Sequence, residues 1–246
     1  MESEKGSLPA QADNGLFPGV LEKGTHIGLT PPLRDRGLVG YWPFDEGTGT
    51  TAYDHSGNNN TGTLTNGPTW QSGTNCKQGG CLSFDGVDDY VNAGSDSVLS
   101  NTEAITLIAW VRSNSSTQTW NTVVGKGFEK TANYSFEAYS NWIRLTIGNG
   151  TSYYTSVVYT PVLGGWFSIA GVFEKSSSSV TTLNIYINGS LLASNNYFVP
   201  LTLSDAPLGV GHSYSNGYFN GLVDDVRVYN RALSVAEILA IYNATK

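Results

Sequence analysis

The stretch Ile105-Thr-Leu-Ile-Ala-Trp-Val111 decides the fold, because both of its faces are apolar when it is read as a β-strand. Side chains of a strand alternate between its two faces. Isoleucine, leucine, alanine and valine fall on one face of this stretch, and Ile108 and Trp110 fall on the other. A strand that is apolar on both faces is typical of the middle of a sheet. We therefore predict a central strand here.

Further short stretches of strand-like composition lie on both sides of this one. They are rich in Val, Ile, Thr and aromatic residues, and turns rich in Gly and Asn separate them. The predicted strands are 38–44, 61–64, 81–84, 90–92, 123–125, 134–139, 142–147, 156–159, 166–173, 183–187, 190–194, 208–211 and 221–229. Asn188-Gly189 is the strongest hairpin signal, since both residues tolerate positive φ. The fold class that follows is all-β.

The two ends of the chain differ from this pattern. Ser234-Val-Ala-Glu237 has the spacing of a capping box and precedes an apolar stripe, so one short helix is expected at the C-terminus. Residues 1–36 show no period of 2 or 3.6 and contain several Gly and Pro residues. We interpret 1–36 as a linker or N-terminal arm and 37–246 as one domain.

The charge balance excludes two classes of partner. The chain has 13 Lys and Arg against 20 Asp and Glu, which gives a net charge of −7. Nucleic-acid phosphates and anionic lipid headgroups would repel such a protein. No run of apolar residues is long enough to span a membrane. The start of the chain lacks the features of a signal peptide, so we expect any leader or anchor to lie on a missing upstream region.

The two cysteines indicate the compartment. Cys76 and Cys81 flank a short loop with two glycines, which lets the chain turn back so that a disulfide can form. The alternative is a zinc site, which needs two more soft ligands, and the three histidines have no ligand-like spacing. A disulfide favours an oxidising environment, and we expect a secreted or cell-surface protein.

Six motifs, in this order, carry a resemblance to a known family. They are 40-GYWPFDEGTG-49, 54-DHSG-57, 84-FDGVDDYV-91, 107-LIAWV-111, 185-IYING-189 and 221-GLVDDVRVYNRALS-234. The series resembles the laminin-G-like jelly-roll modules of the concanavalin-A-like superfamily, of the type found in secreted and surface proteins of bacteria and archaea. The resemblance covers 37–246. It implies a two-sheet antiparallel jelly-roll sandwich whose first and last strands lie side by side.

The resemblance also implies a calcium ion near that seam. The positions it points to are Asp54, a backbone carbonyl near Gly57, Asn60 and Asp224, with Asp45 as a weaker candidate. Calcium takes six to eight oxygen ligands, and the loop 54–60 offers several. The alternative is that these Asp and Asn residues only cap turns. For the acidic turn 85–89, turn capping is favoured over a second metal site.

Aromatic side chains at or near predicted loops are the candidates for stacking on sugar rings. They are Trp120, Tyr139, Trp142, Tyr153 and Tyr154. Cross-strand aromatic pairing would explain the same residues equally well.

Catalysis is not supported by any motif. The sequence contains no alternating pair of carboxylates of the kind that glycoside hydrolysis needs, no nucleophile elbow and no phosphate-binding loop. We therefore expect a non-enzymatic binding or adhesion module for a glycan or a cell-surface protein. One alternative is a structural subunit of a pilin-like or other surface assembly that joins through a missing N-terminal region. A second alternative is a glycan-active enzyme.

Overall fold

The computed structural model describes most of the chain from Asp35 onward. The described residues are 35–114, 119–127, 132–156, 158–177, 180–198, 203–213 and 217–246. The predicted arm therefore lies, except for its last two residues, outside the described part. Its character and the domain boundary at residue 37 stay predictions.

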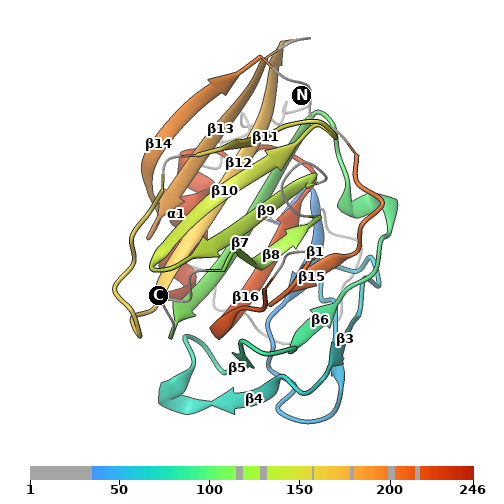
Figure 1. Cartoon of the computed structure of the whole chain (residues 1–246), viewed down its shortest axis with the longest axis vertical. Coiled ribbons are helices and arrows are strands. Elements are labelled where there is room, and N and C mark those ends of the chain that lie inside the picture. Colours follow the sequence, from blue (N-terminus) through green and yellow to red (C-terminus); the bar gives the residue numbers. More distant parts are fainter. Residues whose placement is uncertain are drawn as a thin grey trace, which may run out of the picture. The chain divides into compact units, whose positions relative to one another are not determined.

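The described strands form two sheets, each held by antiparallel ladders (Figure 1). Sheet A runs, in spatial order, β14 (Ser190–Tyr197), β13 (Val180–Ile187), β12 (Phe167–Ser177), β7 (Ala104–Ser113), β16 (Asn220–Tyr229), β5 (Gly80–Asp85) and β4 (Thr69–Ser72), and β1 (Leu38–Trp42) also pairs with β16. Sheet B runs β11 (Tyr153–Thr155), β10 (Trp142–Gly148), β9 (Tyr134–Tyr139), β8 (Asn121–Lys126), β15 (Leu208–Val210), β6 (Tyr90–Asn92), β3 (Gly62–Thr65) and β2 (Thr51–Ala52). This confirms the predicted jelly-roll sandwich.

The predicted central strand is confirmed as β7, which pairs with β12 on one side and β16 on the other. Its Ile105, Leu107, Ala109 and Val111 side chains lie in the main core that the two sheets share. Ile108, on the opposite face of β7, belongs to a second buried cluster with Ile238 and Ile241 of the helix α1 (Val235–Thr245). The strand is apolar on both faces because it packs against the core on one face and against α1 on the other.

The seam between the first and last strands is also confirmed. β1 pairs with β16, and Tyr41 lies opposite Arg227 and Trp42 opposite Val226. β5 pairs with the earlier part of β16, through Val223. The ladder between β16 and β7 is irregular between Asp224 and Arg227. Asp224 and Asp225 therefore lie where β16 passes from β5 to β1.

The predicted hairpin and the predicted disulfide are both present. Asn188 and Gly189 have φ of 50° and 76°, which suits a two-residue turn between twisted strands. Cys76 and Cys81 are joined. The strand predicted at 156–159 is wrong: the structure has β11 at Tyr153–Thr155, and Tyr159 makes only an isolated bridge to Ile143.

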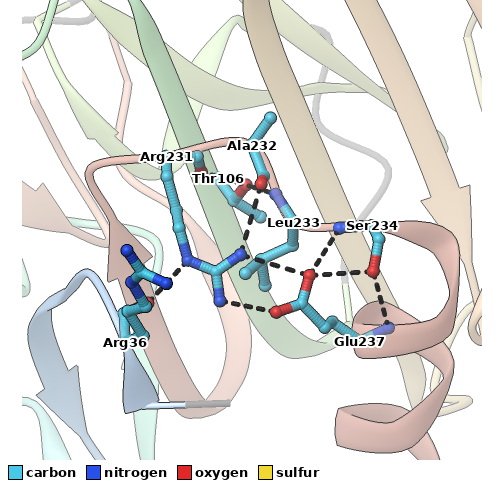
Figure 2. Close-up of polar contacts among 7 residues, drawn as sticks. All are labelled: Arg36, Thr106, Arg231, Ala232, Leu233, Ser234 and Glu237. Carbon is cyan, nitrogen blue, oxygen red and sulfur yellow. Dashed lines mark hydrogen bonds and ion pairs between the residues drawn. The ribbon is translucent and has the colours of Figure 1, made fainter. Parts of the chain in front are cut away.

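The capping box predicted at the start of α1 is confirmed, and Figure 2 shows how it is held. The Ser234 hydroxyl accepts from the Glu237 amide, and the Glu237 carboxylate accepts from the Ser234 amide. Arg231 forms an ion pair with Glu237 at 2.6 Å and donates to the Arg36 carbonyl at 2.7 Å. The Thr106 hydroxyl of β7 donates to the Arg231 carbonyl and accepts from an amide of the same turn. This network fixes α1 against the outer face of sheet A. Among the described residues, no helix has the length and apolar character needed to cross a membrane.

Candidate functional site

The outer face of sheet B carries a buried ion pair. Phe136 and Leu145 point into the core, so the residues next to them in β9 and β10, Glu137 and Arg144, point outward. There Glu137 and Arg144 are direct cross-strand partners. The Arg144 Nε and Nη2 atoms lie 3.0 and 2.8 Å from Glu137 Oε2. Thr146 donates to Oε2 of the same carboxylate and Ser135 donates to Oε1, so Glu137 is held by four hydrogen bonds.

Four aromatic side chains surround this ion pair. The Arg144 guanidinium carbon lies 3.6 Å from the centre of the Trp120 ring and 5.2 Å from that of Tyr153. The ring centres of Trp120 and Tyr139 are 4.9 Å apart, and those of Tyr139 and Trp142 are 6.2 Å apart. A guanidinium over an aromatic face is attracted by the ring electrons. We call Trp120, Tyr139, Trp142, Tyr153 and Arg144 the aromatic cluster.

The aromatic cluster is covered only in part. The residues Trp142 and Tyr153 are 46% and 42% exposed, whereas Trp120 and Tyr139 are half-buried. Glu137 is fully buried and Arg144 nearly so. The charged pair is therefore shielded beneath the rings, while the edges and faces of two rings remain open to solvent.

Four of the five aromatic residues singled out from the sequence therefore come together, and one does not. Tyr154 follows Tyr153 in β11 and points to the opposite face of the sheet. There it packs on the core beside Tyr197, with ring centres 5.3 Å apart. Tyr154 was predicted to belong to the ligand-binding set, but the alternation of side chains within β11 directs it inward.

Sequence reasoning missed Arg144 and did not recognise Glu137 as its partner. A signal was available in the turn Ser140-Asn141 between β9 and β10. A two-residue turn places residues at equal distances from it opposite each other. Tyr139 then lies opposite Trp142, and Glu137 lies opposite Arg144, as observed in the register of β9 and β10.

Asp54, the first of the predicted calcium ligands, acts as a turn cap. Its Oδ1 accepts from the Tyr41 and Ser56 amides at 2.9 and 2.8 Å. Its Oδ2 accepts from the Ser56 hydroxyl and the Asn60 amide, both at 2.9 Å. Gly57 is exposed, with φ of 89°, in the same loop. This is the geometry of the alternative in which the loop residues cap backbone amides.

The structure does not bring Asp54 and Asp224 together. The amide and carbonyl of Tyr41 both bond to the loop 54–60, whereas β16 lies along the other edge of β1. The Asn60 side chain donates to the Val39 carbonyl, which ties the same loop to the same edge of β1. β1 therefore separates Asp54 from the strand that carries Asp224.

Asp224 and Asp45 instead meet at the disulfide loop. Asp224 Oδ2 accepts from the Lys77 and Gln78 amides at 3.0 and 2.9 Å, and Asp45 Oδ1 accepts from the Gly80 amide at 2.6 Å. The other oxygen of Asp224, Oδ1, is buried and has no hydrogen-bond partner among the described residues. Burial raises the pKa of Asp224 to about 7, and the charges of Asp225 and Asp45 contribute. A buried carboxylate oxygen without a partner, beside a second carboxylate, fits a bound cation.

The acidic turn between β5 and β6 also follows the capping geometry. Asp85 accepts from the Val87 amide at 2.7 Å, and Asp89 accepts from the Asp85 amide at 3.0 Å. Carboxylate oxygens of Asp85, Asp88 and Asp89 lie within 4.8 Å of one another. Desolvation raises the pKa of Asp89, and its two neighbours add to the shift. The turn is thus a patch of negative charge at the start of β6.

Comparison with known proteins places the chain in a family. A model described as the concanavalin A-like lectin/glucanases superfamily matches residues 85–239. A comparison with curated proteins found no match. Domain 4 of the extracellular arabinanase AbnA of Geobacillus stearothermophilus, solved with arabinotriose, is 20% identical with a TM-score of 0.65, over 83% of this chain and 98% of that one.

Toxin binding domains share the same fold. The receptor-binding domain of botulinum neurotoxin type G is 16% identical with a TM-score of 0.64, over 85% of this chain and 51% of that one. The binding domain of botulinum neurotoxin DC, solved with rat synaptotagmin II, is 16% identical with a TM-score of 0.63, over 86% and 52%. The chain spans about half the length of these toxin domains. At such identities the likeness concerns the fold.

Proposed function

Because the chain belongs to the concanavalin A-like lectin/glucanases superfamily, we propose that it is a non-catalytic module that binds carbohydrate on the outer face of sheet B. The observation that carries this proposal is the aromatic cluster around Arg144. The likeness to a domain solved with arabinotriose supports a sugar as the ligand class.

The aromatic cluster has the properties that sugar binding needs. The apolar faces of sugar rings pack on aromatic side chains, and the hydroxyls need fixed polar partners nearby. Trp142 and Tyr153 offer exposed rings, and the buried Arg144 guanidinium, itself fixed by Glu137, holds the Trp120 and Tyr153 rings in place. Groups that are already held in place lose little conformational freedom on binding, which favours affinity.

The environment of Glu137 argues against catalysis. A glycosidase acid or base must be able to exchange a proton with the substrate, opposite a second carboxylate. The two oxygens of Glu137 already accept from Arg144, Thr146 and Ser135, and the residue is fully buried. Glu137 therefore serves to hold Arg144, and the proposed module binds its ligand without changing it.

The proposal is tested with the purified chain on an array of neutral oligosaccharides that includes arabinotriose. We expect retention of one or more glycans, and a loss of about tenfold in affinity for Trp142→Ala, the size expected for a central aromatic contact. The matched control is Leu239→Ala on α1, a similarly exposed apolar residue at 43%, which should leave the affinity unchanged. Equal losses in both variants, or no retained glycan, would contradict the proposal.

We further propose that calcium binds at Asp224 with Asp45, and not between Asp224 and Asp54. The ion would neutralise the buried Oδ1 of Asp224 and thereby stabilise the fold. Millimolar calcium should raise the melting temperature of EDTA-treated protein by several degrees. Asp224→Asn should remove this response, whereas Asp54→Asn should keep it even if it lowers the starting stability. A calcium response lost in Asp54→Asn alone would move the site to the loop 54–60.

An extracytoplasmic location accompanies this function. The disulfide Cys76–Cys81 supports an oxidising compartment, and the arabinanase that contains the similar domain is extracellular. Self-assembly through the N-terminal region concerns residues outside the described part of the chain. Analytical ultracentrifugation of the purified full chain tests self-assembly, with a monomer as the expected result, and a free-thiol assay on the unreduced protein tests the disulfide, with no free thiol expected.

A further inference from the structure

A second feature on the outer face of sheet B is a cavity of about 220 Å³ beside β6 and β15. Its lining combines two ring side chains, an amide, a hydroxyl and backbone. The lining residues are Tyr90, Val91, Asn92, Pro207, Leu208, Gly209, His212 and Ser213. None of them belongs to the aromatic cluster. The volume is below that of drug-sized pockets, so the cavity suits a single small ring.

The sheet register places the cavity and the aromatic cluster on the same face. Residues directly opposite each other across a sheet point to the same side. One such row runs Thr63, Asn92, Gly209, Gly125, Ser135 and Thr146. Ser135 and Thr146 hold Glu137 beneath the aromatic cluster, and Asn92 and Gly209 line the cavity. β6 and β10 are four strand spacings apart, about 19 Å, so one sugar ring cannot touch both places.

Glycine at position 209 lets the chain after β15 form one wall of the cavity. A Cβ atom on Gly209 would lie 1.9 Å from the His212 carbonyl oxygen, so only glycine lets the segment after β15 approach the sheet. That segment is anchored, since the Gly211 amide donates to the Val123 carbonyl and the Ser213 hydroxyl accepts from the Gly127 amide. The cavity is therefore preformed by backbone contacts.

The walls of the cavity suit a sugar ring. The His212 ring meets Tyr90 edge-on, with ring centres 5.9 Å apart, and stacks on Tyr218 at 4.3 Å. Its Nδ1 lies 3.2 Å from the Gly217 carbonyl, which fixes the ring plane. Asn92 Oδ1 accepts from the Gly94 amide, which directs the amide nitrogen and its two N–H groups away from that contact. The Tyr90 and His212 rings that line the cavity offer apolar surface, and the Asn92 amide offers a donor, for the corresponding parts of a sugar.

The charge around the cavity selects among sugars. The turn Asp85–Asp89 directly precedes Tyr90, and the Asp89 carbonyl lies 3.0 Å from where a Cβ of Gly211 would be. The three carboxylates of this turn place negative charge within a few residues of Tyr90, which lines the cavity. Anionic sugars such as sialic acid are disfavoured there, and uncharged or amino sugars are accepted.

We propose that this cavity, lined by Tyr90, Asn92 and His212, is a second binding site that takes one uncharged or amino sugar ring, separate from the aromatic cluster. The inference rests on the proposed function only for the class of ligand. A glycan that spans about 19 Å along this face would reach both places, which makes the cavity an additional subsite of the same face.

The test is a titration of the isotopically labelled full chain by NMR with single sugars. The probes are glucose, galactose, arabinose, glucosamine and N-acetylneuraminic acid, each up to about 100 mM, since one ring gives a dissociation constant near the millimolar range. We expect an uncharged sugar or glucosamine to shift the amides of Tyr90, Asn92 and Gly209. No shift at these amides with any of them, or an equal response to N-acetylneuraminic acid, would overturn the proposal.

Variants separate this inference from the proposed function. Asn92→Ala should weaken the single-sugar binding that is read at the amides of Tyr90, Asn92 and Gly209 about fivefold, as expected for one lost hydrogen bond, and Leu239→Ala on α1 should leave it unchanged. Asn92→Asp keeps the side-chain shape and replaces the donors, so it should weaken binding as well and serves if Asn92→Ala folds poorly. An effect of Trp142→Ala equal to that of Asn92→Ala would contradict a separate site. Binding of oligosaccharides through Trp142 with a silent cavity would leave the proposed function standing and refute only this inference.

Discussion

The two outer faces of the sandwich are covered in different ways. On sheet A, α1 lays Ile238 and Ile241 against Ile108 of β7, and Trp110 packs beside Tyr242 with ring centres 5.6 Å apart. On sheet B, the part of the outer face near the β11 edge holds the Glu137–Arg144 ion pair under a partly exposed layer of aromatic rings. The apolar side of a helix covers the outer face of sheet A. The outer face of sheet B keeps aromatic rings and polar groups at its surface.

Under the proposed function, this difference separates stability from ligand binding. An apolar face must be covered to remove it from water, and α1 does so for sheet A. The aromatic cluster keeps large rings at the surface of sheet B, held rigid by a charged pair whose burial is itself costly. A buried charged pair adds little net stability to a fold. It does fix the position of the guanidinium and of the rings around it. We therefore expect substitutions on the two faces to affect different properties.

The largest effect on stability should come from breaking the ion pair of sheet B. Glu137→Ala leaves Arg144 buried without a charged partner and should lower the free energy of unfolding by about 3–5 kcal/mol. Urea denaturation followed by tryptophan fluorescence measures this change.

Arg144→Met combined with Glu137→Leu is the control for that prediction. Replacing both charges should recover most of the lost stability, because no charge is then left unpaired. Carbohydrate binding should not recover, since the guanidinium that orders Trp120 and Tyr153 is absent. A double variant that is stable and still binds would show that the ion pair does not shape the binding face.

On sheet A, truncation of the helix should cost stability without affecting binding. Ile241→Ala removes a buried side chain, 5% exposed, from the cluster between α1 and the sheet. The expected loss is about 2–4 kcal/mol. The affinity for a retained glycan should match that of the unaltered protein at a temperature where both are folded. Loss of affinity in parallel with stability would mean that the two faces are coupled.

A smaller effect is expected at the network of Figure 2. The hydrogen bond with Arg231, aided by Ser234, lowers the pKa of Glu237 to about 2 from 4.5. The stability linked to this ionisation is therefore present above pH 4.5 and is lost as the pH falls through 2. Because the pair is partly exposed, Glu237→Gln should cost only about 1 kcal/mol at neutral pH. The variant and the unaltered protein should converge in stability in acid, and a constant difference at every pH would contradict the ion-pair account.

Local sequence signals predicted much of the fold. The apolar faces of 105–111 identified β7, the pair Asn188-Gly189 gave the β13–β14 turn, and Ser234-Val-Ala-Glu237 gave the start of α1. Each of these depends on residues close together in the chain. The strand at 156–159 was misplaced because the Ser156 hydroxyl accepts from the Leu145 amide, and no such contact is visible in a local pattern.

The candidate site was only partly predictable for the same reason. Tyr139 and Trp142 were found as aromatic residues near a turn, but their meeting with Trp120 depends on the β8–β9 register. The expected pairing of Asp54 with Asp224 assumed that neighbouring strands bring their loops together. Whether Asp54 meets Asp224 depends on which edge of β1 the loop 54–60 contacts. Tertiary packing determines that edge.

The most direct test of the account is a map of where a retained oligosaccharide binds. Amide hydrogen exchange, or NMR shifts in the labelled full chain, should change on β8–β11 when the glycan is added, and the exposed helix face of α1 should stay unaffected. Changes confined to β12–β14 or α1, with none around Trp142 and Tyr153, would contradict the assignment of sheet B as the binding face.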